Sequence, residues 1–225
     1  MKKILIFCWP VLVLLPVMAQ AVNVGEVTSM MAPDEFSLSK EIANTTDSAR
    51  FVSVTVYRLS SPMAEGVIIP MESKVELLST PSSLILPGNA KDNFRFFYKG
   101  PNDDKERYYR LSWTDEPITE SGYTRKSKQG QATTSAVINT ILVVGPRNER
   151  FDFKREGADI YNTGNAAFRV ISFGACKDKK LEQGKGCRER YYIMPGMSVK
   201  IKYTDITDKK TRIGIWHGKT YINVK

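Results

Sequence analysis

The sequence predicts an all-β protein made of two β-sandwich domains, and three observations support this fold class. Apolar and polar residues alternate along several stretches, whereas the three-to-four-residue spacing of amphipathic helices is almost absent. Turn-forming Pro, Gly and Asn residues recur between these stretches. Hydrophobic residues make up 42% of the 225 residues and charged residues 25%, which indicates a folded chain. Many short strands between turns are typical of a sandwich or barrel, and the length favours two sandwiches.

Residues 1–21 have the three parts of a secretory signal peptide. Two lysines open the chain, residues 4–18 are uncharged and mostly apolar, and Ala19-Gln20-Ala21 is a small-x-small cleavage sequence. The alternative is a membrane anchor, but an anchor needs about 20 apolar residues, and two prolines interrupt this shorter segment. We therefore expect cleavage after Ala21, a mature chain that starts at Val22, and export without stable membrane insertion.

Three stretches give the clearest strand patterns along the mature chain. Each has apolar or aromatic side chains at every second position, which indicates a strand with one buried and one solvated face. In chain order, the alternating residues are Val52, Val54 and Val56, then Phe94, Phe96 and Tyr98, then Val199, Ile201 and Tyr203.

We expect the domain boundary between Gly145 and Glu149, where a long apolar stretch ends and a polar one begins. The first domain would then cover residues 22–146 and the second residues 147–225. The second is small for a sandwich, and small domains bury a smaller share of their surface.

The cysteines predict one disulfide bond in this smaller domain. Cys8 lies in the signal peptide, so an exported chain keeps Cys176 and Cys187 in an oxidising compartment. Two free buried thiols are the alternative. A redox-active pair is less favoured because the sequence contains no Cys-x-x-Cys motif.

The segment from Gln129 to Pro146 contains no charged residue, and its core, Ser135–Val144, is a long run rich in β-branched residues. A polar, basic segment at residues 121–130 precedes it. An ordinary central strand is one interpretation. If the first half overhangs the sheet, however, it is an uncharged edge of the kind that recruits another strand. Binding by strand addition would then use these residues: Ser135, Ala136, Val137, Ile138, Asn139 and Ile141.

Four motifs add a resemblance to a known family: Arg95-Phe-Phe-Tyr-Lys-Gly-Pro101, Glu106-Arg-Tyr-Tyr-Arg110, Thr140-Ile-Leu-Val-Val-Gly-Pro-Arg147 and Asn162-Thr-Gly-Asn165. With the signal peptide and the long strand, the chain resembles the periplasmic chaperones of the chaperone–usher pathway. The likeness is to the alternate branch, which serves common-pilus and colonisation-factor fimbriae. The resemblance implies two Ig-like domains, no catalysis and no cofactor. It also implies that the chain lends its long strand to pilin subunits in the periplasm and delivers them to the outer-membrane usher.

One departure from the family concerns the pilin C-terminal carboxylate. The better-known branch holds it with a Lys on the long strand and an Arg on the first strand, and neither residues 129–146 nor residues 22–31 contain a Lys or Arg. Because the planar guanidinium of Arg suits a carboxylate, Arg95 and Arg110 are the leading candidates. Arg107 and Arg147 are weaker ones. For each arginine, a solvated face or an interdomain ion pair is the alternative.

Three other function classes are weaker. A structural or adhesive fimbrial subunit usually has one domain and an N-terminal extension. An enzyme would depend on the single histidine, His217, or on carboxylates that we expect in turns and at strand ends. Three cysteines and one histidine exclude a Cys₄ or Cys₂His₂ zinc site. The net charge of +9 would suit nucleic acid, but an exported protein meets little of it. We expect this charge to attract acidic subunits or the usher.

Overall fold

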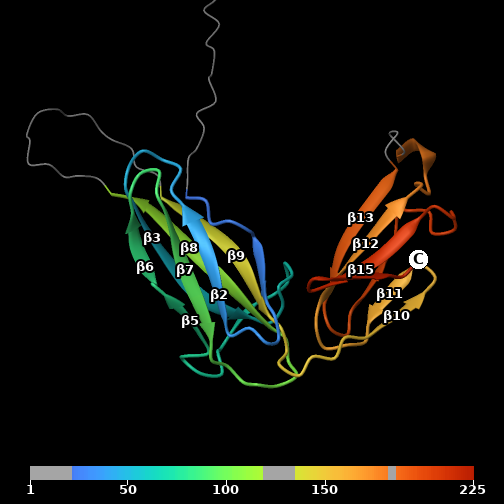
Figure 1. Ribbon diagram of the computed structural model, residues 1–225, viewed down its shortest axis with the longest axis horizontal. Coiled ribbons are helices and arrows are strands. Elements are labelled where there is room, and N and C mark those ends of the chain that lie inside the picture. The colour runs from blue at the N-terminus through green and yellow to red at the C-terminus, as the bar shows by residue number, and fades with distance from the viewer. Residues whose placement is uncertain (1–21, 119–134, 182–185) are drawn as a thin grey trace, which may run out of the picture.

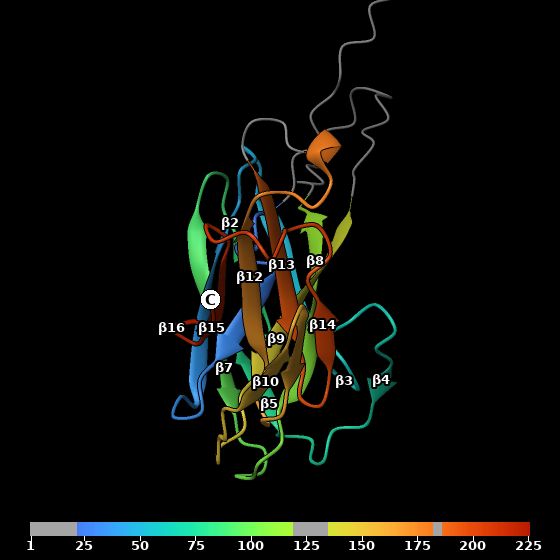
Figure 2. The same cartoon turned by 90° about the vertical axis from the view of Figure 1, so that its right-hand side faces the viewer.

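The computed structural model describes residues 22–118, 135–181 and 186–225, and it confirms the all-β fold. The predicted signal peptide and the basic segment at residues 121–130 lie outside the described residues. Figure 1 shows two lobes that meet at one end, and in the turned view of Figure 2 the second lobe lies in front of the first.

The first sandwich consists of two sheets packed face to face. One has the strand order β1-β9-β8-β3-β4 with β6 also paired to β3, and the other has the order β2-β7-β5. The strands are β1 (Thr28–Met31), β2 (Ser37–Ala43), β3 (Arg50–Leu59), β4 (Ile68–Ile69), β5 (Leu77–Thr80), β6 (Ser83–Leu86), β7 (Lys91–Tyr98), β8 (Arg107–Pro117) and β9 (Ala136–Val144).

Aromatic side chains fill the core between these sheets. The ring of Trp113 on β8 meets the rings of Phe94 and Phe96 on β7 edge to face, with centroids 5.1 and 6.0 Å apart. All three side chains are fully buried. Such edge-to-face pairs add to the stabilisation from burial itself.

The second sandwich is smaller and also has two described sheets, with orders β10-β11-β14 and β13-β12-β15-β16. Its core is aliphatic around Phe168. A disulfide joins Cys176, just after β12, to Cys187, the first residue of β13, as predicted. The elements are β10 (Phe153–Glu156), β11 (Asp159–Asn162), β12 (Phe168–Gly174), a 3₁₀ turn (Lys179–Leu181), β13 (Cys187–Ile193), β14 (Ser198–Lys200), β15 (Arg212–His217) and β16 (Thr220–Asn223).

The strand expected through Tyr203 ends at Lys200, so its predicted length was wrong. The reason is the buried carboxylate of Glu189, which accepts hydrogen bonds from the backbone N–H groups of Lys202 at 2.8 Å, Tyr203 at 2.9 Å and Thr204 at 2.6 Å. Burial alone would raise the pKa of Glu189, but the hydrogen bonds from the Tyr191 hydroxyl and these N–H groups outweigh it and lower that pKa to about 2.

Short contacts join the two lobes near residue 106. The half-buried carboxylate of Glu106 accepts hydrogen bonds from the Tyr108 hydroxyl at 2.7 Å and from the backbone N–H of Ala167 at 2.7 Å. The Asn165 side chain donates to the carbonyl of Asp104 at 2.9 Å. Because the two hydrophobic cores are separate, we propose a division into residues 22–146 and 147–225.

Candidate functional site

The two edges of β9 have different partners. One edge pairs with β8 along the whole strand, from Ala136 opposite Asp115 to Val144 opposite Arg107. The other edge pairs with β1 in parallel, and only from Ile141 to Val144. Among the described residues, no strand pairs with this second edge at residues 136–140. The first half of β9 therefore does not overhang its sheet, because β8 is long enough to hold it, but it is open on one side.

The path of the N-terminal segment explains why β1 is short. Asn23 forms a bridge with Ala43 of β2, which belongs to the opposite sheet. Gly25 follows with a φ of 71°, a conformation that favours glycine. The chain then crosses over and joins β9 from Thr28 onward. Because of this change of sheet, the N-terminal segment does not pair with the first half of β9.

Side chains of β9 alternate between the core and the outer face of the sheet. Thr140, Leu142 and Val144 are buried, Thr140 accepts a hydrogen bond from the Trp113 indole at 3.0 Å, and Ile138 packs against the core. Val137 is 64% exposed. Asn139 is exposed and Ile141 half-buried, on the same side as Val137. Ser135 is exposed and Ala136 half-buried at the start of the strand. The structure therefore separates Val137 from Ile138.

Arg110 lies on this same outer face, in the row next to the open edge. Its register partners are Ile141 on β9 and Tyr57 on β3. The neighbouring row holds Ser112 opposite Asn139 and Thr55. Arg110 is half-buried and makes no hydrogen bond or ion pair with any residue in the described part of the chain.

Arg95 lies on the other outer face of the sandwich. It is exposed on β7 between Phe94 and Phe96, whose rings point into the core. Arg95 and Arg110 therefore belong to opposite outer faces, and the structure does not bring the two candidate anchors together.

The two weaker arginine candidates are engaged by their own chain. Arg107 is buried and donates to Asp103 at 2.6 Å and to Glu72 at 3.0 Å. Its hydrogen bond lowers the pKa of Asp103 to about 2. Arg147 donates to the carbonyls of Ala32, Pro33 and Glu35, and its guanidinium lies over the rings of Phe36 and Tyr98. Both arginines hold the end of the first sandwich in place.

The possible catalytic groups also have internal partners. Nε2 of His217 lies against Oε1 of Glu149, a contact that is an ion pair only with a protonated imidazole, and the ring stacks on that of Phe151 at 4.4 Å. Asp115 is buried and accepts Arg50 Nε at 2.6 Å. Within residues 22–118, 135–181 and 186–225, no group of three or more His, Cys, Asp or Glu could hold a metal ion.

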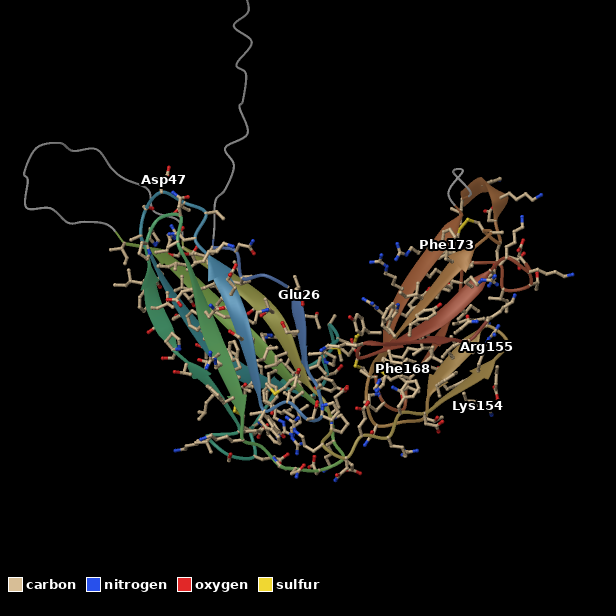
Figure 3. The ribbon with its side chains drawn as sticks, viewed as in Figure 1. Glu26, Asp47, Lys154, Arg155, Phe168 and Phe173 are labelled. Atoms are coloured by element: carbon tan, nitrogen blue, oxygen red, sulfur yellow. A yellow bond between two sulfur atoms is a disulfide. The ribbon has the colours of Figure 1, made fainter. Side chains whose placement is uncertain are left out.

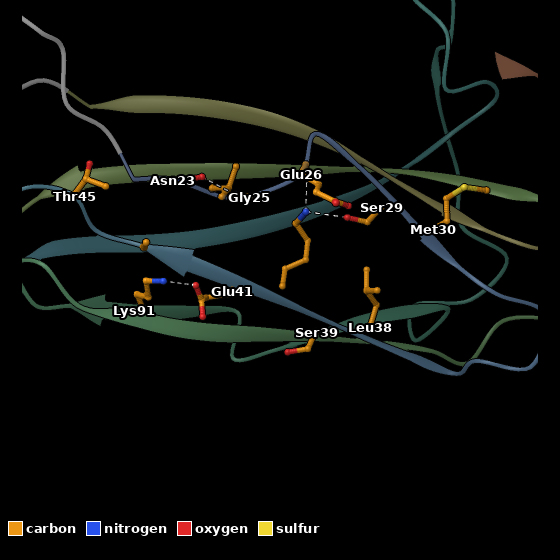
Figure 4. A pocket seen from close by; sticks show the side chains of 13 residues that line it. Asn23, Gly25, Glu26, Ser29, Met30, Leu38, Ser39, Glu41, Thr45 and Lys91 are labelled. Carbon is orange, nitrogen blue, oxygen red and sulfur yellow. Dashed lines mark hydrogen bonds and ion pairs between the residues drawn. The ribbon is translucent and has the colours of Figure 1, made fainter. Parts of the chain in front are cut away.

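A hollow of about 550 Å³ lies beside β1 and β2 (Figure 4). Lys40 lines it, and its ammonium donates to the Glu26 carbonyl at 2.7 Å and to Ser29 Oγ at 2.9 Å. Burial lowers the pKa of Lys40. Since the chain itself satisfies this ammonium, we assign it a structural role at the sheet crossing.

Smaller hollows lie between the two lobes and contain residues that the sequence reasoning missed. Arg169, Tyr192 and Trp216 line one of them together with Met30 of β1. Tyr192 also lines a second one with Ile141 and Val143 of β9. The alternation along residues 168–174 and 187–193 was the signal that could have identified them.

Comparisons with known proteins agree with this architecture. Residues 151–224 match the family model described as the EcpB C-terminal domain. A probable fimbrial chaperone EcpB of Klebsiella pneumoniae subsp. pneumoniae is 45% identical over 207 residues, which cover 92% of each chain. A probable fimbrial chaperone EcpB of Escherichia coli is 44% identical with the same coverage.

Solved structures agree in fold. The class 5 fimbriae chaperone CfaA matches with a TM-score of 0.54 at 16% identity, over 90% of this chain and 97% of that one. The periplasmic chaperone SfaE matches with a TM-score of 0.51 at 13% identity, over 90% and 98%. In the described part of the chain, no helix is long and apolar enough to cross a membrane.

Substitutions on the two faces of β9 should change the stability of the protein by unequal amounts. Replacing buried Leu142 with Ala leaves a cavity and should lower the free energy of unfolding by about 2–5 kcal/mol. Replacing exposed Val137 with Ala should change it by less than about 0.5 kcal/mol. Urea unfolding of the two purified variants measures both values, and equal losses would contradict the assignment of faces.

Proposed function

Because the chain belongs to the EcpB family of probable fimbrial chaperones, we propose that it binds fimbrial subunits in the periplasm and lends them β9. The observation that carries this proposal is the half-open edge of β9 at residues 136–140. In the proposed function the chain keeps the subunit folded and then hands it to the outer-membrane usher. None of these steps requires a catalytic residue or a cofactor.

Strand addition at this edge would use two kinds of contact. The unpaired backbone groups of residues 136–140 offer hydrogen bonds that do not depend on the sequence of the guest. The side chains of Val137, Asn139 and Ile141 lie on the outer face beside that edge. Each aliphatic side chain that becomes fully buried would contribute about 1.5–3 kcal/mol to the complex.

We propose Arg110 as the residue that holds the C-terminal carboxylate of the subunit. Its guanidinium has no internal partner among the described residues and stands one strand from the open edge of β9. Arg95 has the same chemistry but projects from the opposite outer face. A hydrogen-bonded Arg–carboxylate pair would therefore form with Arg110.

Val137→Asp should prevent subunit capture. The change places a charge where the guest would otherwise bury an apolar side chain. We therefore expect the yield of the complex to fall by a factor of about ten or more. Val67→Asp is the matched control, because Val67 is 61% exposed and directly precedes β4, which is three strands from β9 in the sheet. The measurement is the amount of subunit that co-purifies with each variant from periplasm. Normal capture by Val137→Asp would remove the case for strand donation by β9.

Arg110→Gln should weaken subunit binding by about 10- to 100-fold, since hydrogen bonds to charged groups contribute about 1.5–3 kcal/mol. Arg95→Gln makes the same chemical change on the opposite face and should leave binding near the wild-type level. Competition for subunit between each variant and the wild-type chain gives the ratio of affinities. If both variants compete equally well, the carboxylate is held elsewhere.

The surroundings of Val22 support export and cleavage after Ala21. Val22 is buried, and its backbone nitrogen donates to Oδ2 of Asp115 at 3.1 Å. Asp115 is buried too, and its other oxygen accepts from Arg50. Cleavage would turn this N–H into an α-ammonium opposite a buried carboxylate, so the processed chain would gain a charge-assisted hydrogen bond.

A mature chain that starts at Val22 should therefore be more stable than one that keeps Ala21. We expect a difference of about 1.5–3 kcal/mol in the free energy of unfolding, the range for hydrogen bonds to charged groups. In an Asp115→Asn background the difference should largely disappear, because the charged acceptor is gone. N-terminal sequencing of the exported protein checks the cleavage point. A stability difference that survives Asp115→Asn would rule out this ion pair.

A further inference from the structure

The outer face of the sheet β13-β12-β15-β16 carries arginines among aromatic side chains. Phe168, Val170 and Ser172 on β12 are buried, so the alternate residues Arg169, Ile171 and Phe173 point outward. Exposed Phe173 lies between Arg188 of β13 and Arg212 of β15 in the register. Along the same face follow a row with Arg190 beside Ile171 and a row with Arg169 between Tyr192 and Trp216. We call Arg169, Arg188, Arg190 and Arg212 the arginine face.

These arginines have no partners of their own. None of the four forms a hydrogen bond or ion pair with another residue in the described ranges. Nε of Arg169 is buried and still lacks a hydrogen-bond partner there. Buried Glu189 lies on β13 between Arg188 and Arg190, but it points inward and binds Tyr191 and the 202–204 backbone. The positive charge is therefore available to another molecule.

The charge of the chain is divided unequally between the two lobes. Residues 147–225 contain 18 Lys and Arg against 9 Asp and Glu, a net charge of +9. Residues 22–146 contain 13 against 15, a net charge of −2. An acidic molecule would therefore be attracted to the second lobe rather than to the lobe that contains β9.

The arginine face continues into the region beside β9. In Figure 1, β12, β13 and β15 lie on the side of the second lobe that is nearer the first, whereas β10 and β11 lie on the far side. Figure 3 shows Phe173 toward one end of this sheet and Phe168 toward the other. The end at Arg169 and Tyr192 lines hollows shared with β1 and β9. A protein bound to β9 would therefore lie beside the arginine face.

We propose that the arginine face binds an acidic surface of the same fimbrial subunit whose strand pairs with β9, an inference that rests on the proposed function. Guanidinium groups bind carboxylates in a bidentate way, and the intervening Phe173, Tyr192 and Trp216 add contact area. Opposite charges also raise the rate of encounter between two proteins. In this arrangement β9 supplies the lasting backbone contact, and the second lobe guides the subunit toward it.

The test compares two triple variants that remove the same charge. Arg188→Gln/Arg190→Gln/Arg212→Gln changes the arginine face, and Lys200→Gln/Lys209→Gln/Lys210→Gln changes exposed lysines on β14 and the following loop. The probe is the fimbrial subunit that co-purifies with the wild-type chain, unfolded and then diluted into each chaperone variant. The rate of complex formation is followed at several salt concentrations.

The arginine variant should form the complex about tenfold more slowly at low salt, with a shallower dependence on salt, because steering by charge is screened by ions. The lysine variant should stay close to the wild-type chain. If thermal unfolding shows that the triple arginine variant is destabilised, the single variant Arg190→Gln replaces it. This variant should also slow complex formation, but by a smaller factor.

Val137→Asp separates this inference from the proposed function. If Val137→Asp loses capture while the arginine variants keep the wild-type rate and salt dependence, the arginine face is not a subunit contact and strand donation stands. If Val137→Asp captures subunit normally, strand donation fails first. If the arginine variants capture the subunit as the wild-type chain does but no longer bind phosphatidylglycerol vesicles, the proposal is wrong. The arginine face would then bind a lipid surface and not the subunit.

Discussion

A β-strand has two hydrogen-bonding edges, and within the described part of the chain β9 has a partner along all of one edge and half of the other. The N-terminal segment causes this, because it pairs first with β2 and reaches β9 only from Thr28 onward. An unpaired edge is normally a hazard, since it invites association with other strands. Here the edge is uncharged, and β8 holds the strand from the other side. The strand can therefore stay in place while it offers half of its backbone to a guest.

Burial explains which cations remain available for binding. A charged group inside a protein must be paired or its desolvation is not offset. Arg50 meets Asp115, Arg107 meets Asp103 and Glu72, and Lys40 meets a carbonyl and a hydroxyl. Each of these supports the first sandwich. Arg110 and the arginine face have no such partner among the described residues, so their charge is available to another molecule.

Features that depend on the local sequence pattern could be predicted from the sequence. Features that depend on contacts between residues far apart in the sequence could not. Alternation correctly identified the strands around Val54 and Phe96, and export with two remaining cysteines correctly gave the disulfide. The end of β14 could not be predicted, because the backbone N–H groups that follow it bind the Glu189 carboxylate, which lies 13 to 15 residues away in the sequence. Arg95 and Arg110 both alternate with buried aromatics, and only the sheet order places them on opposite faces.

The same limit applies to the face of β9, and it bears on specificity. A period of two divides the strand into two sets of side chains but does not say which set meets the core. Pairing with β8 shows that Val137 and Ile141 point outward. Backbone hydrogen bonds at an open edge would hold almost any extended segment, so they cannot distinguish one guest from another. Discrimination must then come from side chains, and the outer residues of β9, Arg110 and the arginine face are the groups placed to provide it.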